Sequence, residues 1–241
     1  MTCCTLTGME KKILIALFIF FNCVLLTPFV YGSLHTPSGA VFLGTVHYPP
    51  DYLYYLSHIT QGREHLLFTT FLTTTEPMPN LFISFVYVFL GKIGYMLHIS
   101  PIYMYQIGLV LFGSLYMYAA YTIIKFFYPT KLTNRILTFL LFMFSNTLPR
   151  IVFENGQRIL APYFSWYNYG EPFLRFESIP HHLLIFASIF MMVSCYLHYQ
   201  REKGLKQKIL LVAIAVISAI SLGIMNPVQW MLLVGTLGLF S

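Results

Sequence analysis

Charge is what this sequence has least of. Only 9% of its 241 residues are charged, against about 25% in an ordinary soluble domain. Cysteine is also scarce, and Cys3, Cys4, Cys23 and Cys195 lack the paired spacing of a zinc site. There is no P-loop, no GxSxG nucleophile elbow and no GxGxxG dinucleotide motif. These absences exclude a soluble globular enzyme, a disordered tail and a disulfide-stapled secreted module, and they argue against nucleic-acid binding.

Apolar runs dominate what is there, because hydrophobic residues make up 57% of the chain. A membrane-spanning helix needs roughly 20 mostly apolar residues. The sequence therefore predicts an all-α, polytopic membrane helical bundle. We treat residues 1–241 as one N-terminal transmembrane domain. It has five complete spans, the first of them a signal anchor, and a sixth cut short by the end of the sequence. The predicted spans are about 13–31, 101–124, 136–153, 183–199, 209–225 and 228–241.

The placement of the basic residues predicts the orientation. If Leu81–His98, which Lys92 interrupts, does not cross, one side holds the N-terminus and the loops Lys125–Arg135 and Arg201–Lys208. That side then has nine of the 14 basic residues. By the positive-inside rule that side is cytoplasmic, so the N-terminus is inside. The membrane that we expect is the plasma (inner) membrane. We therefore expect about 81–98 to form an interfacial or re-entrant helix.

The first outer segment, between the first two spans, contains the leading candidate carboxylate. Asp51 follows two prolines and is placed as the N-cap of a juxtamembrane amphipathic helix at about 51–62. The face expected on the membrane consists of Leu53, Leu56 and Ile59. The face expected toward an aqueous cleft consists of Asp51, Tyr55 and His58. A capping role alone would also explain Asp51, so catalysis and capping both stay open.

Two further residues of this segment are candidates. Glu76 lies between a threonine-rich stretch and two prolines, and a second carboxylate suits general-base or metal work. A solvated loop glutamate is the alternative. Lys92 is costly inside an apolar helix unless it reaches water or pairs with an anion, which makes it a candidate ligand for a phosphate.

The second outer segment, 154–182, mixes charged and aromatic residues. Arg158 and Arg175 are candidate phosphate ligands, while Trp166 and Glu171 suit a sugar ring and its hydroxyl groups. An interfacial aromatic belt with locally paired charges explains the same composition. His181 stands at the start of a predicted span, where a loop hydrogen bond is the alternative to substrate binding.

Four stretches follow one another in a distinctive order: HYPPDYLYYLSHITQGREHLLFTTFLTTTEP, NLFISFVYVFLGKIGYMLHISPIYMYQIG, GEPFLRFESIPHH and NPVQW. In this order the chain resembles prokaryotic, polyprenyl-phosphate-sugar-dependent membrane proteins of the GT-C glycosyltransferase superfamily. The resemblance implies sugar transfer at the extracytoplasmic face, from a lipid-linked sugar donor to an acceptor, with a carboxylate of the first outer loop as base or metal ligand. Carried over, that carboxylate is Asp51, and involvement of a divalent metal stays open.

The sequence thus predicts a membrane glycosyltransferase whose other partner is membrane lipid. Its predicted catalytic residues are Asp51 and Glu76. Its predicted substrate-binding residues are Tyr55, His58, Lys92, Arg158, Trp166, Glu171, Arg175 and His181. The alternative is a polytopic transporter, a flippase-like protein or a non-catalytic membrane protein that binds lipid-linked substrates. Charges clustered outside the spans, and the lack of an internal repeat, favour the enzyme.

Overall fold

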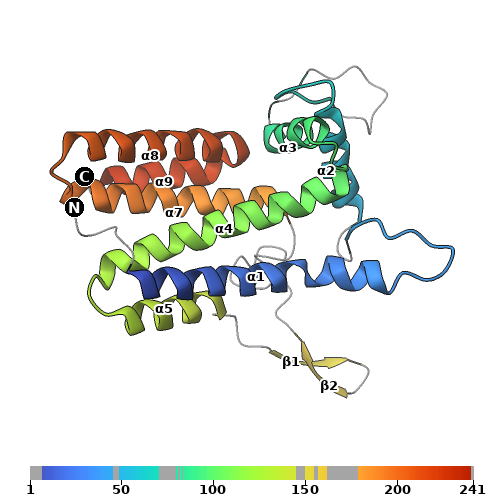
Figure 1. Cartoon of the computed structure of the whole chain (residues 1–241), viewed down its shortest axis with the longest axis horizontal. Coiled ribbons are helices and arrows are strands. Elements are labelled where there is room, and N and C mark those ends of the chain that lie inside the picture. The colour runs from blue at the N-terminus through green and yellow to red at the C-terminus, as the bar shows by residue number, and fades with distance from the viewer. Residues whose placement is uncertain are drawn as a thin grey trace.

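The computed structural model describes residues 7–45, 49–70, 80, 82, 84–144, 150–154, 157–161 and 179–239. In these ranges the chain is a helical bundle with one small hairpin (Figure 1). The predicted helical membrane fold class is confirmed. The elements are α1 (Gly8–Leu34), α2 (Pro49–Gln61), α3 (Phe85–Met96), α4 (Pro101–Phe127), α5 (Leu132–Phe144), β1 (Arg150–Glu154), β2 (Gln157–Ala161), α7 (Pro180–Arg201), α8 (Leu205–Met225) and α9 (Pro227–Leu239).

Within the described residues, four helices are long and apolar enough to cross a membrane: α1, α4, α7 and α8. The shortest of them has 21 residues, which at 1.5 Å per residue is about 31 Å. All four run along the long axis of the molecule (Figure 1). Much of their surface is exposed apolar side chain, as expected for helices that face lipid.

Helix α4 is the centre of the bundle, packed against α1 on one side and α7 on another. It runs antiparallel to α1, since Asn22 donates to the Ser114 hydroxyl at 2.9 Å while Glu10, earlier in α1, meets Tyr121, later in α4. It runs parallel to α7, since Gly108 lies beside Pro180 and, further along both helices, the Thr122 and Ser194 hydroxyls are 2.9 Å apart. Small side chains and interhelical hydrogen bonds of this kind are typical of helix packing in lipid.

The start of α1, the α4–α5 connection and the α7–α8 connection lie at one end of the bundle, as the charge distribution predicts (Figure 1). We call this the basic end. There the Arg201 guanidinium carbon is 3.7 Å from the centre of the Phe126 ring, so the end of α7 contacts the end of α4. Helices α2 and α3 lie at the opposite end.

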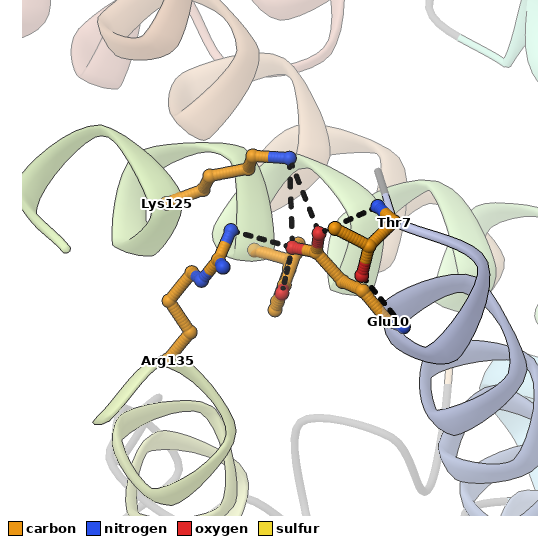
Figure 2. Close-up of polar contacts among 5 residues, drawn as sticks. Thr7, Glu10, Lys125 and Arg135 are labelled. Carbon is orange, nitrogen blue, oxygen red and sulfur yellow. Dashed lines mark hydrogen bonds and ion pairs between the residues drawn. The ribbon is translucent and has the colours of Figure 1, made fainter. Parts of the chain in front are cut away.

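At the basic end, the buried carboxylate of Glu10 contacts side chains from two other helices. Glu10 has no solvent-exposed surface. It accepts hydrogen bonds from the Tyr121 hydroxyl at 2.6 Å and the Arg135 guanidinium at 2.7 Å, with the Lys125 ammonium at 3.5 Å (Figure 2). Thr7 and Glu10 also form a capping box at the start of α1. One side chain therefore joins α1, α4 and α5.

The prediction of a continuous span over 136–153 is wrong. Helix α5 ends at Phe144 after 13 residues, about 20 Å, and β1 begins at Arg150. The intervening sequence contains Pro149, which cannot donate to a helical hydrogen bond. Strands β1 and β2 pair antiparallel, with Glu154 opposite Gln157. The two residues between them in sequence are Asn-Gly, a strong hairpin signal.

Helix α3 has only 12 residues, about 18 Å, which is shorter than the hydrocarbon core. It ends in a Schellman motif, in which the Ile99 amide donates to the Gly94 carbonyl at 2.8 Å and His98 takes a left-handed φ of 56°. The chain then turns directly into α4 at Pro101. Both ends of α3 thus stay at the end of the bundle where α4 begins.

Candidate functional site

Helix α2 carries Asp51 in its first turn rather than at its N-cap. The helix begins at Pro49, two residues earlier than predicted. Proline suits this position, because the first amides of a helix have no intrahelical partner and the ring fixes a helical φ. Asp51 is therefore not the N-cap residue that the sequence predicts. Its carboxylate still lies where the helix dipole favours negative charge.

Helices α2 and α3 cross with their backbones in contact. A Cβ added to Gly91 would collide with the Ile59 carbonyl oxygen, and one added to Gly62 would collide with the Val88 carbonyl oxygen. Only glycine permits this approach, which explains Gly62 in the turn after α2 and Gly91 inside α3, where intrinsic helix propensity disfavours glycine. The close crossing fixes the position of α2, and so of Asp51, relative to α3.

Beside Asp51 the two helices meet α4 and α7 in a group of ring side chains, which we call the aromatic cluster. It consists of Tyr52, Tyr55, Tyr87, Tyr105 and His181. Tyr55 stacks on Tyr87 with ring centroids 4.7 Å apart, and the Tyr52 and Tyr105 rings meet edge to face at 4.8 Å. The Tyr87 hydroxyl is 2.7 Å from Nδ1 of His181. Four helices from distant parts of the sequence thus share one cluster.

Asp51 is exposed at the edge of this cluster. Its charge acts on two cluster phenols, those of Tyr55 and Tyr105. Burial, reinforced by the Asp51 charge, raises the pKa of Tyr55 to about 12, and burial alone raises the pKa of Tyr52 to about 12. These phenols therefore stay protonated at neutral pH and can donate hydrogen bonds next to a carboxylate that faces water.

His58 does not face an aqueous cleft, so that prediction is wrong. Its side chain is buried and hydrogen-bonds through Nδ1 to the Thr69 hydroxyl, which also donates to the Gln61 amide oxygen at 2.8 Å. Burial lowers the pKa of His58 to about 4. Ile59, predicted to lie on the membrane, is buried too, against Gly91. His58 thus ties α2 to the segment that follows it.

Lys92 lies at the far end of α2 from Asp51. Its ammonium group donates to the backbone carbonyl of Arg63 at 3.4 Å, just after α2 ends. This bond and partial exposure account for a cation on an apolar helix. The structure does not bring Lys92 into the aromatic cluster.

The second outer segment is described only in part. Arg158 lies on β2, where its backbone pairs with Phe153 of β1. Three other predicted residues of this segment, Trp166, Glu171 and Arg175, fall outside the described residues. Glu76 of the first outer segment does so too. Of the predicted substrate-binding residues, the structure brings together Tyr55 and His181, beside the predicted catalytic Asp51.

Sequence reasoning missed Tyr52, Tyr87 and Tyr105. Tyr52 adjoins Asp51, and Tyr87 and Tyr105 lie in apolar helices where aromatic residues are usual. Their signal is recognisable only in retrospect: a buried phenol needs a hydrogen-bond partner, so tyrosines inside predicted helices mark polar contacts between them.

No group of three metal-binding side chains occurs among the residues that the structure describes. No protein-family model, curated protein or solved structure matches the chain. A function for this chain is therefore inferred from its fold class and from the geometry around Asp51.

Proposed function

We propose that this chain belongs to a membrane glycosyltransferase that moves a sugar from a polyprenyl-phosphate-type donor to an acceptor at the extracytoplasmic face. Asp51 acts as the general base or, if a divalent metal takes part, as its ligand. The basic end is then cytoplasmic, and α2 and α3 lie at the outer surface of the plasma (inner) membrane.

The observation that carries the proposal is the position of Asp51. It is an exposed carboxylate at the end of a membrane bundle opposite the basic residues. Its charge acts on the phenols of Tyr55 and Tyr105, and Gly62 and Gly91 let α2 and the turn after it lie close against α3. A lipid-linked substrate at the membrane surface would meet the carboxylate there.

The chemistry suits inverting transfer. A carboxylate that faces water can accept the proton of an acceptor hydroxyl as the sugar–oxygen bond forms. Tyr55, the partly exposed phenol of the cluster, can donate a hydrogen bond to a sugar hydroxyl. Stabilising a leaving phosphate needs cations, for which Arg158 and Arg175 are the candidates.

Asp51→Asn in the full-length protein tests the proposal. The change keeps the size of the side chain, and its loss of helix-dipole stabilisation is only about 0.3–1 kcal/mol. Sugar transfer from a polyprenyl-phosphate-linked donor, measured in membranes, should fall by roughly 10²–10⁴-fold, as for a lost general base. Glu64→Gln is the matched control, since Glu64 is an exposed carboxylate in the turn after α2. It should leave transfer unchanged.

Near-normal transfer by Asp51→Asn would show that the carboxylate only stabilises the first turn of α2. Glu76 would then be the next catalytic residue to replace. An equal loss in Glu64→Gln would assign the effect to the general negative charge of this surface.

A further inference from the structure

A cavity of about 370 Å³ lies between the last turns of α1, the loop that follows it, and the start of α4. Small-molecule sites in proteins usually measure about 300–1,000 Å³, so the cavity has room for a small ligand. Both helices are membrane-length helices, and the cavity lies where one ends and the other begins. That position corresponds to the bilayer interface, where aromatic residues gather.

Aromatic rings form the apolar part of its wall. The Phe29 ring centroid is 5.9 Å from that of Phe42 and 6.0 Å from that of Tyr103. Phe42 reaches this position because Gly32 of α1 has no Cβ, which would otherwise collide with the Phe42 ring. The loop is thus held against α1 by a specific contact.

Hydroxyl groups form the polar part. Ser33 donates to the Phe29 carbonyl oxygen at 2.8 Å, and Thr36 donates to the Gly32 carbonyl oxygen at 2.7 Å. Each hydroxyl has used its proton, so its oxygen is left to accept a hydrogen bond from a ligand. Ser100, the N-cap residue of α4, makes no side-chain capping bond, so it can donate as well as accept.

The described lining contains no Asp, Glu, Lys, Arg or His. A phosphate or carboxylate would therefore find no charged partner among the described lining residues. Gly44, in the same loop, separates the cavity from the aromatic cluster: its carbonyl accepts a hydrogen bond from Gln106 at 3.0 Å, and the Tyr52 hydroxyl lies against it. The cavity and Asp51 thus lie on different sides of one loop.

We propose that this cavity binds the uncharged, hydroxyl-rich head group of a membrane amphiphile. The aromatic rings pack on the carbon face of the head group, and Ser33, Thr36 and Ser100 hydrogen-bond its hydroxyls. The alkyl chain extends from the cavity into the bilayer between α1 and α4. Binding at this site does not depend on the chemistry proposed for Asp51.

Equilibrium binding tests the proposal with the intact chain in phosphatidylcholine nanodiscs. The probes are radiolabelled octyl glucoside and monooctanoylglycerol, with octyl phosphocholine as the charged-head comparison. Empty nanodiscs give the linear partitioning, and any saturable binding above it belongs to the protein. We expect both uncharged probes to bind saturably, near one per chain, and octyl phosphocholine to show partitioning only. Tighter binding of the glucoside identifies a glycolipid head group, and tighter binding of monooctanoylglycerol identifies an acylglycerol.

Two variants locate the site. Thr36→Val with Ser100→Ala removes two hydroxyls and should weaken saturable binding by roughly 10-fold or more. Thr60→Val is its control. Thr60 is an exposed residue of α2, and its hydroxyl likewise donates to the carbonyl four residues earlier, that of Leu56. Ala40→Phe fills the cavity and should abolish saturable binding.

Ala16→Phe is the control for bulk, since Ala16 lies on the exposed face of α1. Circular dichroism checks the fold of every variant. Three results would overturn the proposal. They are saturable binding that survives in both site variants, an equal loss of binding in the controls, and saturable binding of octyl phosphocholine that matches that of the uncharged probes.

Discussion

Replacing Glu10 by glutamine should destabilise the bundle strongly, because it leaves two buried cations without their carboxylate. Arg135 is 5% exposed and Lys125 8%, so neither regains full hydration when Glu10 is neutralised. The bonds from Tyr121 and Arg135 are both shorter than 2.8 Å. Charge-assisted hydrogen bonds contribute about 1.5–3 kcal/mol each, and breaking a buried ion pair from one side costs about 3–5 kcal/mol. We expect a loss of about 3–5 kcal/mol.

The assay is the free energy of unfolding in mixed micelles, with the midpoint of thermal unfolding in nanodiscs as a second measurement. Glu202→Gln is the matched control. The Glu202 carboxylate accepts only local backbone bonds, at 2.9 and 3.0 Å from the amides of Gly204 and Lys203. That variant should lose clearly less stability than Glu10→Gln.

A double-mutant cycle separates the ion pair from general effects of substitution. In the Glu10→Met background, Arg135→Met removes one of the stranded cations, so it should cost much less than in the wild-type protein. A loss below about 1 kcal/mol for Glu10→Gln, or additive effects in the cycle, would refute the reasoning.

Three further predictions concern α2, α3 and the orientation of the bundle. Gly91→Ala should cost about 1–3 kcal/mol, because its methyl group meets the Ile59 carbonyl, and hydrogen exchange in α2 should accelerate. Because burial lowers the pKa of His58 to about 4 from about 6.5 in the unfolded chain, its neutral form stabilises the fold fully above pH 6.5. This contribution falls progressively between pH 6.5 and 4, so the protection factors of the α2 amides, corrected for the intrinsic pH dependence of exchange, should fall over that window. With native cysteines replaced, a membrane-impermeant thiol reagent added outside should label Glu64→Cys and spare Lys203→Cys.

Each of these predictions has its own control. Gly235→Ala, on α9, meets nothing within 4 Å and should leave stability and exchange near the wild-type values. His58→Gln should flatten the pH dependence, while His65→Gln in the turn beyond α2 should not. Labelling of both cysteine variants from the same side would contradict the orientation of the bundle.

The long helices were predictable because hydropathy and length decide them. The predicted run 101–124 corresponds to α4, and 183–199 corresponds to α7. The charge pattern also places the three basic segments at one end. The run 136–153 misled because apolar residues return at Leu148 and at 151–153, although Pro149 and the Asn-Gly pair favour a break and a hairpin. Composition over a window cannot register such single positions.

The sequence predicted the exposed carboxylate of the candidate site but not the buried packing beneath it. Asp51 stood out as a carboxylate after two prolines, whereas the face of α2 was assigned from membrane contact alone. The structure instead packs α2 on α3, which buries His58 and Ile59. That packing depends on Gly62 and Gly91, and glycines carry no periodic signal. The ion pairs of Glu10 join residues more than 100 positions apart, a separation that no local pattern reveals.

The parallel packing of α4 and α7 has a consequence for how the protein is made. Helices α7 and α8 are consecutive and antiparallel, so they can enter the membrane together as a hairpin. Helix α4 and its parallel neighbour cannot, since the chain must first return from the basic end to the opposite end between residues 128 and 179. The extensive α4–α7 contact therefore forms only after both helices have been inserted, by lateral association in the bilayer. Biogenesis of the bundle thus has two stages, and this contact belongs to the second.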